Sequence, residues 1–186
     1  MPSGGIFSIT NRLFVFAPRF PYFSRFIINQ RLFATRKNTM QHTSSSEHKH
    51  KKFIERAVES EIVWGMASDE GYALCESREF EETKVLPFWS DKAFAIAVNN
   101  TAWSEYQPKS MALPDFLENF LIGMYNEGYL VGTNWDADMN GKECEPLELA
   151  LEISTELVTQ GKELPLKKYQ SVQDFHQQVK NAVETE

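Results

Sequence analysis

The stretch Leu86-Pro87-Phe88-Trp89-Ser90 joins a predicted strand to a predicted helix. Residues 85–88 form an apolar run of strand length, and Pro87 within it indicates an edge strand or a bulge. Ser90 followed by Asp91 is typical of a helix start, because short polar side chains cap the free backbone amides there. The buried face of that helix is predicted to consist of Phe94, Ala95 and Val98.

Two further tryptophan-centred stretches stand at predicted strand ends: Ile62-Val63-Trp64-Gly65 and Gly132-Thr133-Asn134-Trp135-Asp136. Periodicity and turn residues predict the remaining elements. Strands are predicted at 61–66, 72–77, 85–88, 106–111 and 129–133, and helices begin near 53, 90, 113, 146 and 171. We therefore expect an α+β fold with a largely antiparallel sheet of four to six strands and helices packed against it.

The chain divides into three parts by composition. Residues 1–50 read as a disordered basic leader, residues 53–158 as the α+β domain, and residues 159–186 as a linker with a peripheral C-terminal helix. Residues 1–46 contain no acid, six Arg/Lys and seven Phe, which is the composition of a transit peptide. The alternative is that Met40 is the true start. We interpret residues 48–52 (HKHKK) as a solvated basic linker.

Charge is distributed unevenly between leader and body. Residues 1–52 carry nine Lys/Arg and one acid, a net charge of +8, whereas residues 53–186 carry ten Lys/Arg and twenty-five acids, a net charge of −15. Residues 76–84 contribute to this as a charged, exposed connection. So acidic a body is poorly suited to phosphate backbones, which disfavours nucleic-acid binding.

The remaining composition indicates where the protein works. The two cysteines, Cys75 and Cys144, form no paired motif, which favours a reducing compartment over a disulfide framework or a zinc site. No apolar run approaches the ~20 residues of a membrane-spanning helix. We expect a cytoplasmic protein, or a mitochondrial one if residues 1–46 are a genuine transit peptide, and the oligomeric state stays open.

Six motifs recur in the order and spacing of a known family. They are Val63-Trp64-Gly65, Tyr72-Ala73-Leu74, Leu86-Pro87-Phe88-Trp89-Ser90, Tyr106-Gln107-Pro108-Lys109, Leu113-Pro114-Asp115-Phe116-Leu117 and Leu130-Val131-Gly132-Thr133-Asn134-Trp135. On these, the chain resembles the bacterial family known as domain of unknown function 2750, over about residues 53–158. A fainter architectural similarity is to the amino-terminal domain of the SseB family. The resemblance implies a small α+β, cytoplasmic protein with no active-site residues to carry over.

The turn Asp136-Ala137-Asp138-Met139-Asn140-Gly141 has the ligand spacing that begins a calcium loop. The rest of that motif fails, because Leu147 stands where the bidentate glutamate is needed. Asn140-Gly141 is also a strong hairpin signal. We interpret the segment as a structural turn and expect no cofactor; a divalent-metal-dependent regulator or hydrolase built on this turn is the alternative.

No nucleophile–base pattern appears in residues 53–186, which contain a single histidine, His176. An enzyme is therefore disfavoured. The leading hypothesis is a non-enzymatic binding or adaptor protein that meets a basic protein partner through an acidic, aromatic-bearing face. The candidate partner-binding residues are Trp89, Trp135, Asp136 and Asp138. Glu148, Glu152 and Glu156, spaced by four along a predicted helix, are either a solvated face or part of that acidic surface.

Overall fold

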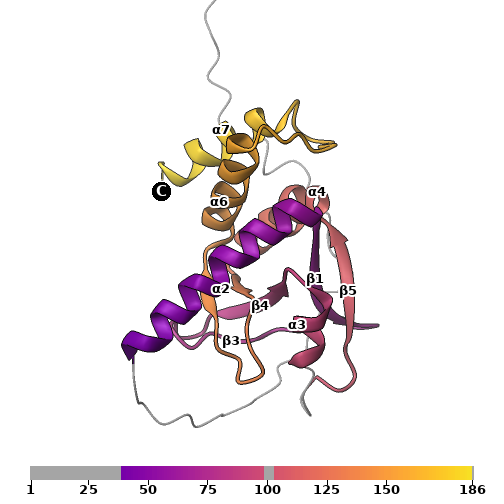
Figure 1. Ribbon diagram of the computed structural model, residues 1–186, viewed down its shortest axis with the longest axis vertical. Helices are drawn as coiled ribbons and strands as arrows, with labels where there is room; N and C mark the ends of the chain where they lie inside the picture. Colours follow the sequence, from indigo (N-terminus) through magenta and orange to yellow (C-terminus); the bar gives the residue numbers. More distant parts are fainter. Residues whose placement is uncertain (1–38, 99–102, 186) are drawn as a thin grey trace, which may run out of the picture.

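The computed structural model describes residues 39–98 and 103–185, which form a sheet with helices packed against it (Figure 1). The α+β prediction is confirmed, although the sheet is larger than expected and mixed, with seven strands. The predictions for residues 1–38 lie outside the described residues. Within the described part, none of the helices is long and apolar enough to cross a membrane.

The strands are β1 (Ile62–Ser68), β2 (Gly71–Tyr72), β3 (Cys75–Glu76), β4 (Lys84–Trp89), β5 (Gln107–Ala112), β6 (Leu130–Thr133) and β7 (Lys142–Cys144). The helices are α2 (Thr39–Ser60), α3 (Lys92–Ala97), α4 (Leu113–Asp115), α5 (Ile122–Asn126), α6 (Pro146–Thr159) and α7 (Val172–Val183). A π-helical segment, η1 (Phe116–Leu121), joins α4 to α5. The single helix predicted from residue 113 is thus continuous but locally widened.

The strand order is β2-β1-β4-β6-β7, with β3 added to β4 and β5 added to β1. Among the strands of the described residues, five of the six pairings are antiparallel, and only β4 and β6 run parallel. The carboxyl ends of these two strands therefore meet at the same edge of the sheet. Trp89-Ser90 and Thr133-Asn134, both taken from the tryptophan-centred stretches, are brought together there.

The prediction that Pro87 marks an edge strand or bulge is wrong, because β4 lies inside the sheet between β1 and β6. One edge of β4 is divided between two partners: Phe88 and Trp89 pair with β1, whereas Lys84 and Val85 pair with β3. Pro87 falls in the gap between them. The ladder on that edge is already interrupted there, so the missing amide hydrogen of proline costs little.

Two apolar cores occupy the two faces of the sheet. The larger core contains Leu86 and Phe88 of β4 and is covered by α2, η1, α6 and α7. The smaller core contains Val85 and Trp89 of β4 and is covered by α3 and the segment around Trp103. The alternation along β4 sends successive side chains to opposite faces, which is why one short strand contributes to both cores.

One element boundary and two burial assignments differ from the sequence predictions. Helix α2 begins at Thr39, so residues 39–50, assigned to the leader, are helical. Helix α7 is not peripheral, because Phe175 is fully buried in the larger core. Phe94, predicted to be buried, is 41% exposed, whereas its neighbours Ala95 and Val98 are buried as expected.

Candidate functional site

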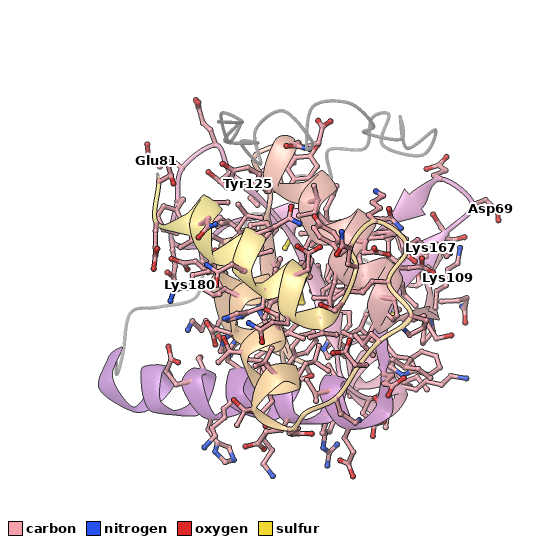
Figure 2. The ribbon with its side chains drawn as sticks, turned by 90° about the horizontal axis from the view of Figure 1, so that it is seen from above. Asp69, Glu81, Lys109, Tyr125, Lys167 and Lys180 are labelled. Carbon is pink, nitrogen blue, oxygen red and sulfur yellow. The ribbon has the colours of Figure 1, made fainter. Side chains whose placement is uncertain are left out.

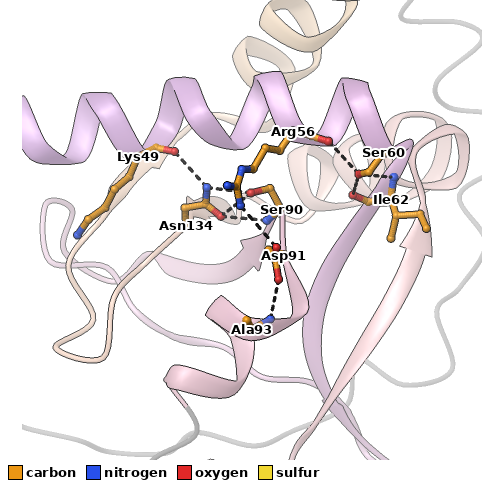
Figure 3. Close-up of polar contacts among 8 residues, drawn as sticks. All are labelled: Lys49, Arg56, Ser60, Ile62, Ser90, Asp91, Ala93 and Asn134. Atoms are coloured by element: carbon orange, nitrogen blue, oxygen red, sulfur yellow. Dashed lines mark hydrogen bonds and ion pairs between the residues drawn. The ribbon is translucent and has the colours of Figure 1, made fainter.

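Asn134 connects the two strand ends to α2 (Figure 3). Its side-chain oxygen accepts hydrogen bonds from the backbone amide of Ser90 at 2.9 Å and from the Ser90 hydroxyl at 3.2 Å. Its side-chain amide donates to the carbonyl oxygen of Lys49 at 3.2 Å. Asn134 has a φ of 46°, a left-handed conformation that asparagine tolerates better than most residues. This one side chain therefore fixes the ends of β4 and β6 relative to the middle of α2.

His50 of α2 lies buried beside this junction. Its Nε2 atom is 2.9 Å from Glu152 Oε2 of α6, and its Nδ1 atom is 2.9 Å from Thr133 Oγ1 of β6. A carboxylate only accepts hydrogen bonds, so Nε2 carries the proton that it donates to Glu152. This bond is the main reason why the pKa of Glu152 lies below its usual value. The basic run of residues 48–52, interpreted as a solvated linker, is thus partly buried.

Hydroxyl, imidazole and carboxylate in this order are the groups of a nucleophile–base–acid triad. Thr133, however, is fully buried and His50 is 3% exposed, so a substrate has no route to the hydroxyl in this conformation. The three residues act here as a polar contact between α2, β6 and α6. The sequence carried one signal for His50: it lies three and four residues before Phe53 and Ile54, on the apolar stripe of α2.

The 136–141 turn uses its own ligand-like groups internally. Asp136 Oδ1 accepts hydrogen bonds from the backbone amides of Asp138 and Asn140, each at 3.0 Å. Asp136 Oδ2 is 2.6 Å from Lys49 Nζ. Burial raises the pKa of Asp136, but the hydrogen bonds from Lys49 and the two amides outweigh it and hold that pKa below its usual value. A cation at this turn would have to displace the lysine, which argues against the metal interpretation.

The two candidate tryptophans do not offer their rings to a partner. Trp89 is fully buried and Trp135 is 3% exposed. The indole nitrogen of Trp89 donates to the carbonyl oxygen of Trp135 at 2.8 Å, and that of Trp135 donates to the carbonyl oxygen of Lys142 at 3.2 Å. Both indoles are satisfied within the smaller core, so we correct their assignment from partner anchors to packing residues.

An exposed aromatic side chain is found instead in the loop between β3 and β4. We call residues 77–83 the acidic loop. Phe80 is 54% exposed, and Glu79, Glu81 and Glu82 around it are exposed as well. Sequence reasoning recognised this segment as a charged connection but did not single out Phe80. The 136–141 turn lies beside it, because Arg78 donates to Asn140 Oδ1 at 2.8 Å and to the carbonyl oxygen of Asp138 at 3.1 Å.

The cysteines are not activated nucleophiles. Burial is the largest cause that raises the pKa of Cys75, to about 12, and burial also raises the pKa of Cys144. Reactive cysteines require the opposite shift, toward the thiolate. Among the described residues, no group of three or more His, Cys, Asp or Glu side chains is arranged to hold a metal ion.

The fold and these contacts define a small α+β protein whose polar residues at the strand ends are engaged with one another. Residues 50–153 match the sequence model of a protein family, DUF2750, which is described as a protein of unknown function. The chain belongs to this family, as the resemblance predicted. The match begins at His50, the residue at which α2 enters the buried polar network. Neither the curated proteins nor the solved structures contain a match to the chain.

Proposed function

We propose that this protein is a non-enzymatic binding or adaptor protein that recognises a basic protein partner through its acidic loop. The observation that carries the proposal is Phe80, an aromatic side chain left 54% exposed between Glu79 and Glu81. An exposed aromatic ring is a rigid apolar group that a partner can bury as an anchor. In the proposed binding face, Phe80 replaces Trp89 and Trp135 as the aromatic residue, and Asp138 remains as predicted from the sequence.

The two kinds of side chain supply different parts of the binding free energy. A buried aromatic anchor contributes affinity through the apolar area that it removes from water. Carboxylates around it favour a partner that carries Lys or Arg, and they mainly raise the rate of association and the specificity. Within the described residues, the side chains of Glu79, Glu81 and Glu82 form no ion pair, so their charges are available to a partner.

The acidic loop is held in one conformation before any partner arrives. The hydroxyl of Ser77 accepts hydrogen bonds from the backbone amides of Glu79 and Phe80, at 3.1 and 2.9 Å. Glu143 of β7 in turn accepts from the Ser77 hydroxyl and from the backbone amide of Arg78. A loop that is already ordered loses less conformational entropy on binding, which supports its use as a recognition element.

We also propose that the protein acts in the cytoplasm. The support is chemical: Cys75 and Cys144 are both free thiols, which fits a reducing compartment.

Co-purification of the tagged full chain from its native host tests the proposal. We expect a basic protein to be retained at low salt and released at about 0.5 M salt, where charges more than a few ångströms apart are screened. Phe80→Ala and the double variant Glu79→Lys/Glu81→Lys should each reduce retention at least about tenfold, because they remove the anchor and reverse the charge.

The matched control is Asp69→Lys/Glu70→Lys, which reverses two acids in the β1–β2 turn. Figure 2 shows Asp69 and Glu81 on opposite sides of the molecule. Equal loss of retention in both double variants would mean that overall charge, and not the acidic loop, attracts the partner. Recovery of the wild-type chain alone at every salt concentration would contradict the proposal.

A further inference from the structure

We infer that residues 45–52 of α2, which we call the strap, open as a local unit and uncover the carboxyl ends of β4 and β6. Figure 1 shows α2 as one long helix that lies across the sheet. The inference rests on how differently the two halves of this helix are attached to the rest of the protein.

Among residues 45–60 of α2, whose side chains the structure describes, the apolar attachment lies after the strap. Phe53, Ala57 and Val58 are fully buried in the larger core, and Ile54 is 8% exposed. The strap itself has the sequence SSEHKHKK, which contains no apolar residue, and His50 is its only buried member. Apolar burial supplies most of the free energy that keeps a helix folded in a protein, so the strap lacks the main stabilising contribution of the other half.

Polar contacts to three other segments hold the strap closed. Lys49 Nζ contacts Asp136 Oδ2 at 2.6 Å and the carbonyl oxygen of Asn140 at 3.2 Å. His50 bonds to Thr133 and to Glu152.

The remaining contacts of the strap are also polar. Asn134 donates to the carbonyl oxygen of Lys49, and Glu47 lies 3.3 Å from Lys142. The side chains of Asp136 and Glu152 are 41% and 42% exposed, and ion pairs that reach solvent contribute little to stability. Opening the strap therefore costs less free energy than unfolding the domain.

The groups beneath the strap are hydrogen-bonding side chains at one edge of the sheet. Opening would free the Thr133 hydroxyl from His50 and release the Asn134 side-chain amide from the carbonyl oxygen of Lys49. They stand at the carboxyl ends of the parallel strands β4 and β6. In open α/β sheets this edge of the parallel strands is where ligands are bound, and β4 and β6 form one such parallel pair here. The open strap would thus present donors and acceptors that the closed conformation occupies with α2.

Hydrogen exchange of the full chain tests the inference. After correction for intrinsic rates, amides of residues 49–52 should exchange at least about tenfold faster in the wild-type protein than amides of residues 57–60, whose carbonyl partners lie outside the strap. The double variant Asp136→Ala/Glu152→Ala removes the carboxylates that hold Lys49 and His50. It should accelerate exchange in the strap by about a further tenfold and leave residues 57–60 unchanged.

The control is Lys51→Ala/Glu55→Ala, which removes an exposed ion pair, 3.9 Å long, between two residues of the same helix. This control should not change the difference in exchange rate between the two halves of α2. Equal protection of both halves in the wild-type protein would overturn the inference, because α2 would then open only as one unit. Acceleration of both halves together in the Asp136/Glu152 variant would overturn it as well.

Discussion

At the scale of single residues, the side chain of Asn134 makes more hydrogen bonds than that of Trp135, the tryptophan of the same stretch. Asn134→Ala removes the acceptor of the Ser90 amide and the donor to Lys49, and it places alanine at a φ of 46°. We expect a loss of about 3 kcal/mol in the free energy of unfolding, measured by urea titration.

Asn134→Gly separates the two contributions, because glycine adopts positive φ without strain but restores no hydrogen bond. We expect its loss to lie between those of wild type and Asn134→Ala. Asn126→Ala, at the exposed end of α5, is the control and should change stability little. If Asn134→Ala were no worse than this control, Asn134 would not be the junction described above.

Gly141 is required by the packing of Trp135 rather than by its backbone angles. A Cβ atom at this position would overlap Trp135 Cδ1 and would lie 2.8 Å from the carbonyl oxygen of Thr133. Because one of these atoms is backbone and the indole is buried, Gly141→Ala should lower the free energy of unfolding by about 2 to 3 kcal/mol.

Gly161→Ala gives the matched comparison for Gly141. Gly161 has a φ of 63°, and a Cβ atom added there would meet nothing within 4 Å, so only the backbone cost of about 1 to 2 kcal/mol applies. Thermal unfolding of both variants measures the difference. A smaller loss for Gly141→Ala than for Gly161→Ala would show that Trp135 moves aside without cost.

At the scale of elements, β4 and α2 show what the sequence could and could not predict. The apolar stripe of Phe53, Ile54, Ala57 and Val58 predicted the second half of α2, because burial leaves a periodic pattern. The strap has no such pattern, since its contacts are polar and are made with residues far along the chain. Pro87 likewise led to the wrong prediction that β4 is an edge strand, because the sequence does not show which strands pair. Strands β1 and β3 each pair with a different part of one edge of β4, and this explains how proline is accommodated.

The contact between α2 and α6 should make stability depend on pH. The hydrogen bond from His50 lowers the pKa of Glu152, and Lys142 lowers it further, against the opposing effect of burial. Because the folded pKa lies below the unfolded one, the unfolded chain binds the proton first as the pH falls. The stabilisation is complete above the unfolded pKa and is lost as the pH falls through the folded pKa.

Glu152→Gln tests this dependence, because glutamine keeps an acceptor for His50 but no charge. Urea titrations from about pH 7 to about pH 3 should show wild type more stable than Glu152→Gln at neutral pH, with the difference shrinking on acidification. Glu55→Gln, an exposed member of the Lys51 pair, is the control. A difference that stays constant over this range would mean that the charge of Glu152 does not stabilise the folded state.

At the scale of the whole molecule, the fold was predictable and the site only in part. Alternating apolar residues and turn residues predicted the α+β class, and the charge count predicted an acidic body. Neither pattern identifies which aromatic residue remains at the surface. Trp89 and Trp135 are buried because α3, Trp103 and the 136–141 turn cover them. Phe80 lies in a loop that is held by hydrogen bonds to its backbone, and its ring stays exposed.

The two faces of the sheet also allow the cooperativity of folding to be measured. All four tryptophans lie in or against the smaller core, and none lies in the larger one. Tryptophan fluorescence therefore reports on the smaller core, while far-ultraviolet circular dichroism reports mainly on the helices over the larger core. Because β1, β4 and β6 supply side chains to both cores, we expect the two signals to change in one transition.

Phe175→Ala tests this expectation by destabilising the larger core, which contains no tryptophan. Phe175 is fully buried, and its ring centroid is 4.9 Å from that of Tyr169, so its removal should cost about 3 to 5 kcal/mol. Both signals should shift to the same lower urea midpoint, because loss of packing on one face destabilises the sheet that the other face needs. If fluorescence kept its wild-type midpoint while circular dichroism shifted, the smaller core would be folding on its own, and the sheet would not couple the two faces.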